Sequence, residues 1–376
     1  MSINKSQKGF NLVELLVAMV LGLFVMSGVF QIFIASKHSN TLLQAEAEMQ
    51  ENARFAFSVM TEIIQEAGNF GCQTVVPAPS QSVVKSADPA TETFKPWKMI
   101  EAWEAKDTDY GQAYTTNPNS GVSNISTAHW SSSGGANKDS GIKSKRSSDI
   151  LKIWYTNPQV ANLTAQAAGI LTFSEIDLKT GDILAINDCQ TVSFAQVCGC
   201  TDTDCAGADN TQADINETSC STPGNTALDL NNINLPTAQV SVLNEAIFFV
   251  GKRSDSKTGY QNNAPSLYMK SLGNNARPGN KEEILEGVES LQIIYGEDTN
   301  NDRSPNYYVS ADKVVDWNHV VSVKLSLLLR SRNNNVTTGV QTIKFNGADI
   351  ILASGDTYLR RVFTTTIALR NRSVGF

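Results

Sequence analysis

An uncharged apolar segment near the N-terminus constrains this chain more than any other feature. Residues 15–35 contain no charged residue and no proline, and they are mostly Leu, Val, Met, Phe and Ile. About 20 such residues in an α-helix span the hydrocarbon core of a bilayer, and a helix satisfies its own backbone hydrogen bonds in lipid. We therefore predict one membrane-spanning helix, which anchors the remainder of the 376 residues.

The short segment before this run differs from an ordinary signal peptide. Residues 1–9 carry Lys5 and Lys8 but have no apolar core, and no Ala-x-Ala site follows the apolar run. Any cleavage should therefore fall before the membrane helix and leave that helix on the mature protein. The two lysines place the leader in the cytoplasm by the positive-inside rule, and everything after Lys37 outside.

Glu14 needs a separate explanation, because it lies at the start of the membrane helix. A carboxylate inserted into a bilayer costs about 2.5–3.5 kcal/mol. One interpretation is a carboxylate that reaches back to the membrane interface. The other interpretation rests on a resemblance of the sequence around Glu14 to a known family.

The sequence around Glu14 resembles the processing site of the type IV prepilins. That site has a glycine, a phenylalanine, three further residues and a glutamate, which match Gly9, Phe10 and Glu14 here. The resemblance implies that a prepilin peptidase cleaves after Gly9 and methylates the new amino terminus of Phe10. It also implies that Glu14 neutralises the terminal amine of a neighbouring subunit in the filament.

Later segments resemble the PilW-type minor pilins. The resemblance implies a structural, non-enzymatic subunit of a type IV pilus tip complex, which contacts other minor pilins and the major pilin, primes assembly and carries a PilY-type adhesin. Twitching, adhesion and DNA uptake would follow from that priming role. The segments are 68–72 (Gly-Asn-Phe-Gly-Cys), 285–292 (Leu-Glu-Gly-Val-Glu-Ser-Leu-Gln) with Tyr295-Gly296, Asp316-Trp317, and 359–366 (Leu-Arg-Arg-Val-Phe-Thr-Thr-Thr).

This resemblance also implies a location and leaves one alternative. The subunit is expected in the inner membrane before assembly, as a single-pass protein with a cytoplasmic N-terminus, and at the pilus tip on the cell surface afterwards. A pseudopilin of a type II secretion system shares the N-terminal pattern but serves protein export. The later segments favour the pilus.

The helix is predicted to continue well beyond the membrane. Apolar residues recur at three-, four- and seven-residue steps from Leu42 to Ala67, with glutamates between them, and Gly68 and Gly71 follow. One helix over residues 10–67 would be about 87 Å long. We divide the chain into a leader (1–9), a transmembrane and assembly half of the helix (10–37), an amphipathic half (38–71) and a β-rich globular region (72–376).

The globular region is predicted to be an antiparallel sheet with long loops, so the fold class is α+β with a pilin-like shape. Short β-branched or aromatic runs bounded by turn residues mark the strands. Residues 72–148 and 198–236 are expected to be loops with little regular structure, because Ser, Thr, Asn, Gly and Pro punctuate them. The predicted strands are 150–155, 170–173, 182–187, 191–197, 246–251, 267–271, 289–296, 320–330 and 361–370.

Six cysteines follow the membrane helix, and an even count outside the membrane favours disulfides over a zinc site. Cys72 lies just past the helix and Cys189 just past a predicted strand, so we predict that they pair. In the alternative, Cys72 pairs with the distal cluster, formed by Cys198, Cys200, Cys205 and Cys220. Cys198 and Cys200 are not expected to pair with each other, because one intervening residue gives a strained loop.

Other kinds of site receive weaker support. Asp298, Asn300 and Asp302 place oxygen atoms at alternate positions, as in the first half of a calcium loop, but Arg303 replaces the expected glycine and Val309 the bidentate glutamate. A polar turn is the other interpretation, and no further cofactor is expected.

The net charge of −7 becomes −9 without the two leader lysines, which argues against direct nucleic-acid binding. No nucleophile, metalloprotease or nucleotide-binding motif is present.

Overall fold

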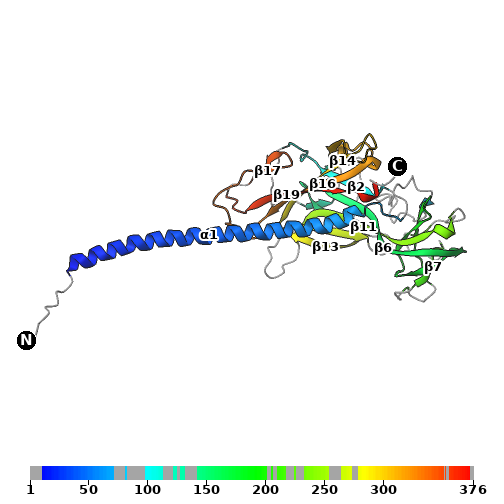
Figure 1. Ribbon diagram of the computed structural model, residues 1–376, viewed down its shortest axis with the longest axis horizontal. Helices are drawn as coiled ribbons and strands as arrows, with labels where there is room; N and C mark the ends of the chain where they lie inside the picture. The colour runs from blue at the N-terminus through cyan, green and yellow to red at the C-terminus, as the bar shows by residue number, and fades with distance from the viewer. Residues whose placement is uncertain are drawn as a thin grey trace, which may run out of the picture.

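One long helix protrudes from a β-rich body (Figure 1). Helix α1 spans Leu12–Gln65, 54 residues. The prediction of a single helix with a pilin-like α+β fold is therefore confirmed, and Gly68, with φ of +70°, follows the end of the helix as expected.

The computed structural model describes residues 11–71, 81–82, 98–112, 122–124, 128–131, 142–200, 205, 210–216, 224–225, 233–253, 264–272, 278–350, 352 and 355–372.

The second half of α1 packs on the body. Its buried side chains are Met49, Ala53, Ala56, Met60 and Ile64, at the three- and four-residue steps that place one face of a helix against a sheet. They belong to one core with the inner faces of both large sheets. The apolar face of this half therefore makes the helix part of the body, whereas the first half has no such contact.

The larger sheet has eleven strands within the described residues. Its centre is β11 (Gln239–Lys252), which pairs antiparallel with β6 (Ile150–Ala167), β8 (Ile183–Asn187) and β12 (Pro265–Leu272). One pair, β1 with β9, is parallel. The remaining strands are β1 (Gln81–Ser82), β2 (Ile100–Ala105), β4 (Trp130–Ser131), β7 (Ile170–Ile176), β9 (Val192–Gln196), β10 (Asn210–Asp214) and β13 (Pro278–Glu286).

A second sheet has the order β15-β14-β16-β19 and is antiparallel throughout. Its strands are β15 (Tyr307–Val309), β14 (Val288–Glu297), β16 (Val320–Arg330) and β19 (Arg360–Ala368). Strand β19 lies along α1 in Figure 1. The smaller elements are the pairs β17 (Ile343–Phe345) with β18 (Ala348–Ile350) and β3 (Val122–Asn124) with β5 (Lys143–Lys145), and the 3-10 turns η2 (Leu235–Thr237), η4 (Ala311–Lys313), η5 (Trp317–His319) and η6 (Arg370–Arg372).

A distal lobe forms at the end of the body opposite the protruding helix, where β7 lies in Figure 1. It consists of the second half of β6 with β7, β8, β9 and β10, and it has its own apolar core. Strand β6 is longer than the predicted strand, which ended at residue 155. It continues past Pro158 because its pairing with β11 shifts register between Thr156 and Val160, so that the proline need not donate a ladder hydrogen bond.

Residues 72–148 were predicted as loops with little regular structure, and this was wrong for part of the segment. Strand β2 pairs with β6 in the large sheet, and Trp103 and Trp130 are buried. Residues 198–236 likewise contain β10 and part of η2. Strand β13 was also missed, because Lys281, Glu282 and Glu283 give it a polar sequence. These strands are stabilised by their neighbours, so their own sequences carry a weak signal.

The packing of α1 on the body can be tested by Met60→Ala. Met60 is fully buried in the main core, so the free energy of unfolding should fall by about 2–5 kcal/mol. The control is Phe55→Ala on the same helix, where the ring is 55% exposed, and the expected change is below about 0.5 kcal/mol. Urea unfolding of the full chain in detergent, followed by tryptophan fluorescence, measures both. Equal losses for the two variants would contradict the packing described here.

Candidate functional site

The N-terminal end of α1 holds Glu14 in the first helical turn. The carbonyl of Asn11 accepts hydrogen bonds from the backbone N–H groups of Glu14 (3.0 Å) and Leu15 (3.2 Å), which starts the helix. The Glu14 side chain is exposed. A carboxylate at this end of a helix interacts favourably with the helix dipole and can pair with an external cation. Gly9 and Phe10, the predicted processing residues, lie outside the described residues.

The first half of α1 exposes an apolar surface on all sides. Its large apolar side chains between Leu12 and Ile34 are 50–76% exposed. The helix is long and apolar enough to cross a membrane. Soluble monomers rarely expose an apolar surface of this size, whereas lipid or neighbouring helices would cover it.

Specific polar contacts hold the other end of α1. After the helix, the N–H of Gly68 donates to the carbonyl of Trp154 at 2.9 Å. The carbonyl of Asn69 accepts from both the N–H (3.1 Å) and the hydroxyl (2.7 Å) of Thr156. On the helix itself, Glu46 forms an ion pair with Arg361 of β19. These contacts fix the direction in which the exposed half leaves the body.

Arg360, the residue before Arg361 in β19, forms a buried ion pair. Arg360 donates from Nε and Nη2 to the two carboxylate oxygens of Glu289, at 2.7 and 2.9 Å, and also binds Asp356 at 2.7 Å. Arg360 and Glu289 are each about 1% exposed, and Arg330 approaches Glu289 at 3.7 Å. Burial lowers the pKa of Arg360, but its hydrogen bonds to Glu289 and Asp356 outweigh this and raise it. The guanidinium is therefore charged and joins β19 to the start of β14.

The sequence interpretation missed this pair, although a signal was present. Glu289 and Arg360 lie in two of the segments that resemble PilW-type pilins, and the structure brings these segments together. Two further motif residues also meet, because Trp317 packs edge-on against Tyr295 with ring centroids 4.9 Å apart. The four-stranded sheet is thus where most of the resemblance is concentrated.

Buried polar side chains join the two large sheets. The carboxylate of Asp149, before β6, accepts from the backbone N–H of Ala105 on β2 (2.9 Å) and of Ile293 on β14 (2.8 Å). Lys145 donates from Nζ to the carbonyl of Glu289 at 2.9 Å. Burial raises the pKa of Asp149 to about 8, although both N–H groups act against this shift. We call this set of contacts the seam.

Glu104 of β2 lies beside the seam. Its pKa is raised to about 10, first by burial and then by the negative charges of Asp149, Asp312 and Asp109. Its Oε2 atom is buried and has no hydrogen-bond partner in the described part of the chain. The carboxyl is therefore protonated and neutral at physiological pH.

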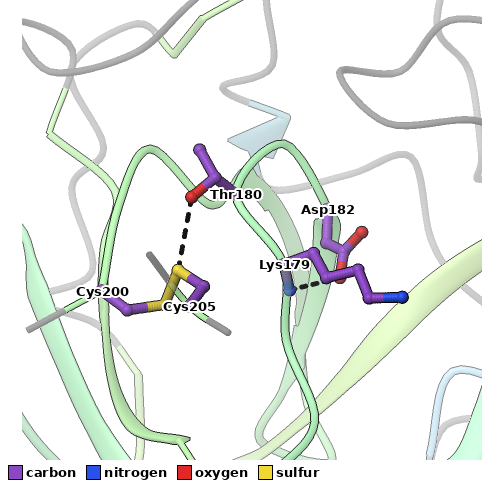
Figure 2. Close-up of a disulfide and its surroundings, with 5 residues drawn as sticks. All are labelled: Lys179, Thr180, Asp182, Cys200 and Cys205. Carbon is purple, nitrogen blue, oxygen red and sulfur yellow. Dashed lines mark hydrogen bonds between the residues drawn. A yellow bond between two sulfur atoms is a disulfide. The ribbon is translucent and has the colours of Figure 1, made fainter. Parts of the chain in front are cut away.

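One disulfide, Cys200–Cys205, closes a short loop in the distal lobe (Figure 2). The hydroxyl of Thr180 donates to Sγ of Cys205 at 3.4 Å, and the Asp182 carboxylate accepts from the N–H of Lys179 at 2.8 Å in the same turn. Cys205 is 2% exposed and belongs to the core of the lobe. The disulfide and the hydrogen bond from Thr180 together connect Cys200 to the β7–β8 turn.

The remaining cysteines are described only in part. Cys200 is bonded to Cys205 and therefore not to Cys198. Cys189 and Cys198 are both disulfide-bonded. Cys72 and Cys220 lie outside the described residues, so the predicted pairing of Cys72 with Cys189 stays a prediction.

The predicted calcium residues lie together in the loop after β14. The carboxylate of Asp298 accepts backbone N–H groups from Asn300 (3.1 Å), Asp302 (3.3 Å) and Arg303 (2.7 Å). Burial raises the pKa of Asp298, but these hydrogen bonds outweigh it and lower the pKa. The turn accounts for the aspartate without a metal ion, and calcium binding stays a prediction. No group of three or more His, Cys, Asp or Glu side chains in the described ranges is placed to hold a metal ion.

Comparison with known families matches both ends of the chain. The model of the type IV pilus-assembly protein W matches residues 247–371, and that of the prokaryotic N-terminal methylation motif matches residues 4–30. These two matches support a PilW-type type IV minor pilin, a membrane-anchored, structural subunit in pilus assembly. The first match contains the whole four-stranded sheet, including the buried Glu289–Arg360 pair. No curated protein and no solved structure matches the chain.

The buried ion pair can be tested by Arg360→Met, which leaves Glu289 buried without its main partner. We expect the free energy of unfolding to fall by about 3–5 kcal/mol. The matched control is Arg361→Met, since the neighbouring Arg361 is 49% exposed and its surface ion pair should contribute less than about 1 kcal/mol. Urea unfolding of the full chain measures both, and similar losses would show that the buried pair has no special role.

The protonated state of Glu104 can be tested by the pH dependence of stability. Its pKa is about 10 in the folded chain against 4.5 for the free side chain, so its contribution to stability is present below pH 4.5 and is lost as the pH rises towards 10. Glu104→Gln removes this titration and keeps a neutral polar group. Relative to wild type, the variant should gain more than about 1 kcal/mol of stability between pH 5 and pH 9. If the difference in stability between the variant and wild type is the same at pH 5, 7 and 9, Glu104 is not neutral in the folded chain.

Proposed function

We propose that this minor pilin is a subunit of the tip complex that primes assembly of the type IV pilus. The observation that carries the proposal is the division of α1 into an exposed apolar half and a half locked to the body. Such a helix can leave the bilayer and enter a bundle of neighbouring pilin helices without exposing apolar surface to water. The folded body stays outside that bundle.

Processing and assembly would use the first residues of the helix. A prepilin peptidase cleaves after Gly9 and methylates the amino group of Phe10. In the filament, the carboxylate of Glu14 pairs with the amino terminus of a neighbouring pilin. Because each charge lowers the cost of burying the other, the pair favours the assembled state and aligns adjacent helices.

A place at the tip fits the shape of the body. The distal lobe extends the molecule at the end opposite the membrane helix (Figure 1). Other minor pilins and the major pilin would contact α1 and the sides of the body, and a PilY-type adhesin would bind beyond them. Before assembly the protein spans the inner membrane with a cytoplasmic N-terminus. Twitching, adhesion and DNA uptake would depend on it through the assembled pilus.

Deletion of the gene tests the role in priming. We expect few or no surface pili, counted by electron microscopy, and recovery when the wild-type gene is restored. Normal piliation of the deletion strain, combined with loss of protein secretion, would instead assign the chain to a type II secretion pseudopilus.

Glu14→Ala tests the proposed assembly contact. The variant should insert into the membrane at normal levels, since removal of a charge lowers the cost of insertion, but it should restore less than about a tenth of wild-type piliation. Gly9→Val serves as a comparison that should retain its leader and also fail to assemble. Immunoblots report the level and processing of each variant. Normal piliation by Glu14→Ala would refute the charge pairing and leave the membrane anchor intact.

A further inference from the structure

A polar cleft lies on the outer face of the four-stranded sheet, beside the turn between β17 and β18. Its volume is about 200 Å³. Two lysines, Lys324 and Lys344, line the cleft, and none of the described residues that line it is acidic. In a chain with a net charge of −7, such a positive concave site is unusual. An anionic ligand would therefore be attracted to this cleft.

The two lysines are available to a ligand. Lys324 lies at the centre of the sheet, opposite Ile294 of β14 and Thr366 of β19, so its backbone is held on both sides. Lys344 lies on β17 near the turn. Neither lysine forms an ion pair or a side-chain hydrogen bond within the described part of the chain.

A larger cavity, of about 350 Å³, lies between α1 and β13, but charged side chains that line it form ion pairs with one another. Three arginines and three glutamates line it, and one of the arginines, Arg253, pairs with Glu283 at 3.3 Å and with Glu286 at 3.7 Å. Because its charges are neutralised internally, that cavity offers less to a charged ligand than the smaller cleft.

Buried hydrogen bonds fix the amide groups of the smaller cleft. Gln292 is 2% exposed, and its Nε2 donates to Oγ1 of Thr108 at 3.2 Å. The Nδ2 of Asn346 donates to Oε1 of Gln292 (3.1 Å) and to the carbonyl of Thr108 (2.8 Å). Asn346 and Gly347 both have positive φ, at +51° and +83°, as required in a tight hairpin turn. The amides are thus held in place before any ligand binds.

An aromatic side chain forms one rim of the cleft. Tyr110 is 69% exposed, and its ring lies so close to Gly347 that a Cβ there would be 3.0 Å from the ring. The N–H of Gly111 donates to the carbonyl of Asn346 at 2.7 Å, which holds the tyrosine segment on the turn. On the sheet, the hydroxyls of Ser326 and Thr364 lie 3.3 Å apart and can both donate and accept hydrogen bonds.

We propose that this cleft binds one acidic sugar residue. The volume is below the range of about 300–1,000 Å³ for drug-sized ligands, which suits a single ring. The lysines would pair with the carboxylate of the sugar, and the amides and hydroxyls with its hydroxyl groups. Tyr110 offers an apolar ring face to the C–H groups of the sugar.

A sugar acid fits this cleft better than a phosphate does. A phosphate group mainly accepts hydrogen bonds, and its sites usually supply arginine forks or several backbone N–H groups. This cleft has acceptors as well as donors, and Oδ1 of Asn346 accepts no hydrogen bond from the described residues. Hydroxyl groups of a sugar can donate to such atoms.

The proposal does not rest on the role in pilus assembly, because it is tested by binding alone. The full chain in detergent is titrated with glucuronic acid, glucose and inorganic phosphate at low salt, and binding is followed by calorimetry and by saturation-transfer NMR. We expect glucuronic acid to bind at least about fivefold more tightly than glucose or phosphate. Its affinity should fall as the salt concentration rises.

Variants of the lining residues locate the binding site. Lys324→Gln and Lys344→Gln should each weaken glucuronic acid binding by about fivefold. The matched control is Lys179→Gln, because Lys179 is an exposed lysine in the distal lobe, and it should bind like wild type. Tyr110→Ala should weaken glucuronic acid and glucose by similar factors, since it removes a contact with the ring and not with the charge.

Three results would overturn the proposal. The first is equal binding of glucose and glucuronic acid, and the second is unchanged binding by both lysine variants. The third is phosphate that binds as tightly as glucuronic acid, which would indicate an unspecific anion site. Unfolding curves of the variants exclude loss of folding as the cause, because Lys344 and Tyr110 are exposed and Lys324 is half-buried.

Discussion

The structure depends on one continuous helix that must satisfy two different surroundings. The backbone groups of α1 are paired within the helix along its length, so its first half can be surrounded by lipid or by other helices. Its second half packs on the body through Met49, Ala53, Met60 and Ile64. Without that burial, a membrane anchor would carry a domain of undefined orientation. With it, the position of the body is fixed relative to the membrane or the filament.

The body in turn depends on buried polar side chains that bind partners far away in the chain. Asp149 connects two sheets through backbone N–H groups, and Glu289 connects β14 to β19 through Arg360. An unpaired buried charge would be very costly, so these residues restrict how the two sheets can be arranged. Arg360 also precedes Arg361 in β19, and Arg361 forms an ion pair with Glu46 of α1. The orientation of the helix and the pairing of the sheets are therefore linked.

Assembly and recognition occupy different parts of this molecule. The apolar half of α1 and Glu14 would face other pilin helices, whereas the cleft with Lys324 and Lys344 lies on the outer face of the four-stranded sheet. The distal lobe is a third part, with its own core and a disulfide. Because these surfaces do not overlap, a change in one can leave the others intact.

Local patterns in the sequence predicted much of this fold. The long helix, the strands β14 and β16, and the position of Glu14 follow from periodicity, from one apolar run and from a short motif. Strands β2 and β13 were missed, because their mixed polar sequences are stabilised by neighbouring strands. The pairing of Cys200 with Cys205 was one of several that the spacing allowed.

The sequence by itself determined that the chain has a membrane helix, a processing motif and a β-rich body, because each of these is encoded by residues close together in the chain. Only the tertiary structure decided how Asp149 binds Ala105 and Ile293, 44 and 144 residues away, and how Glu289 meets Arg360 across 71 residues. The same holds for the cleft, whose residues come from five separate segments. Such contacts depend on which strands become neighbours when the apolar faces are buried, and no local pattern carries that information.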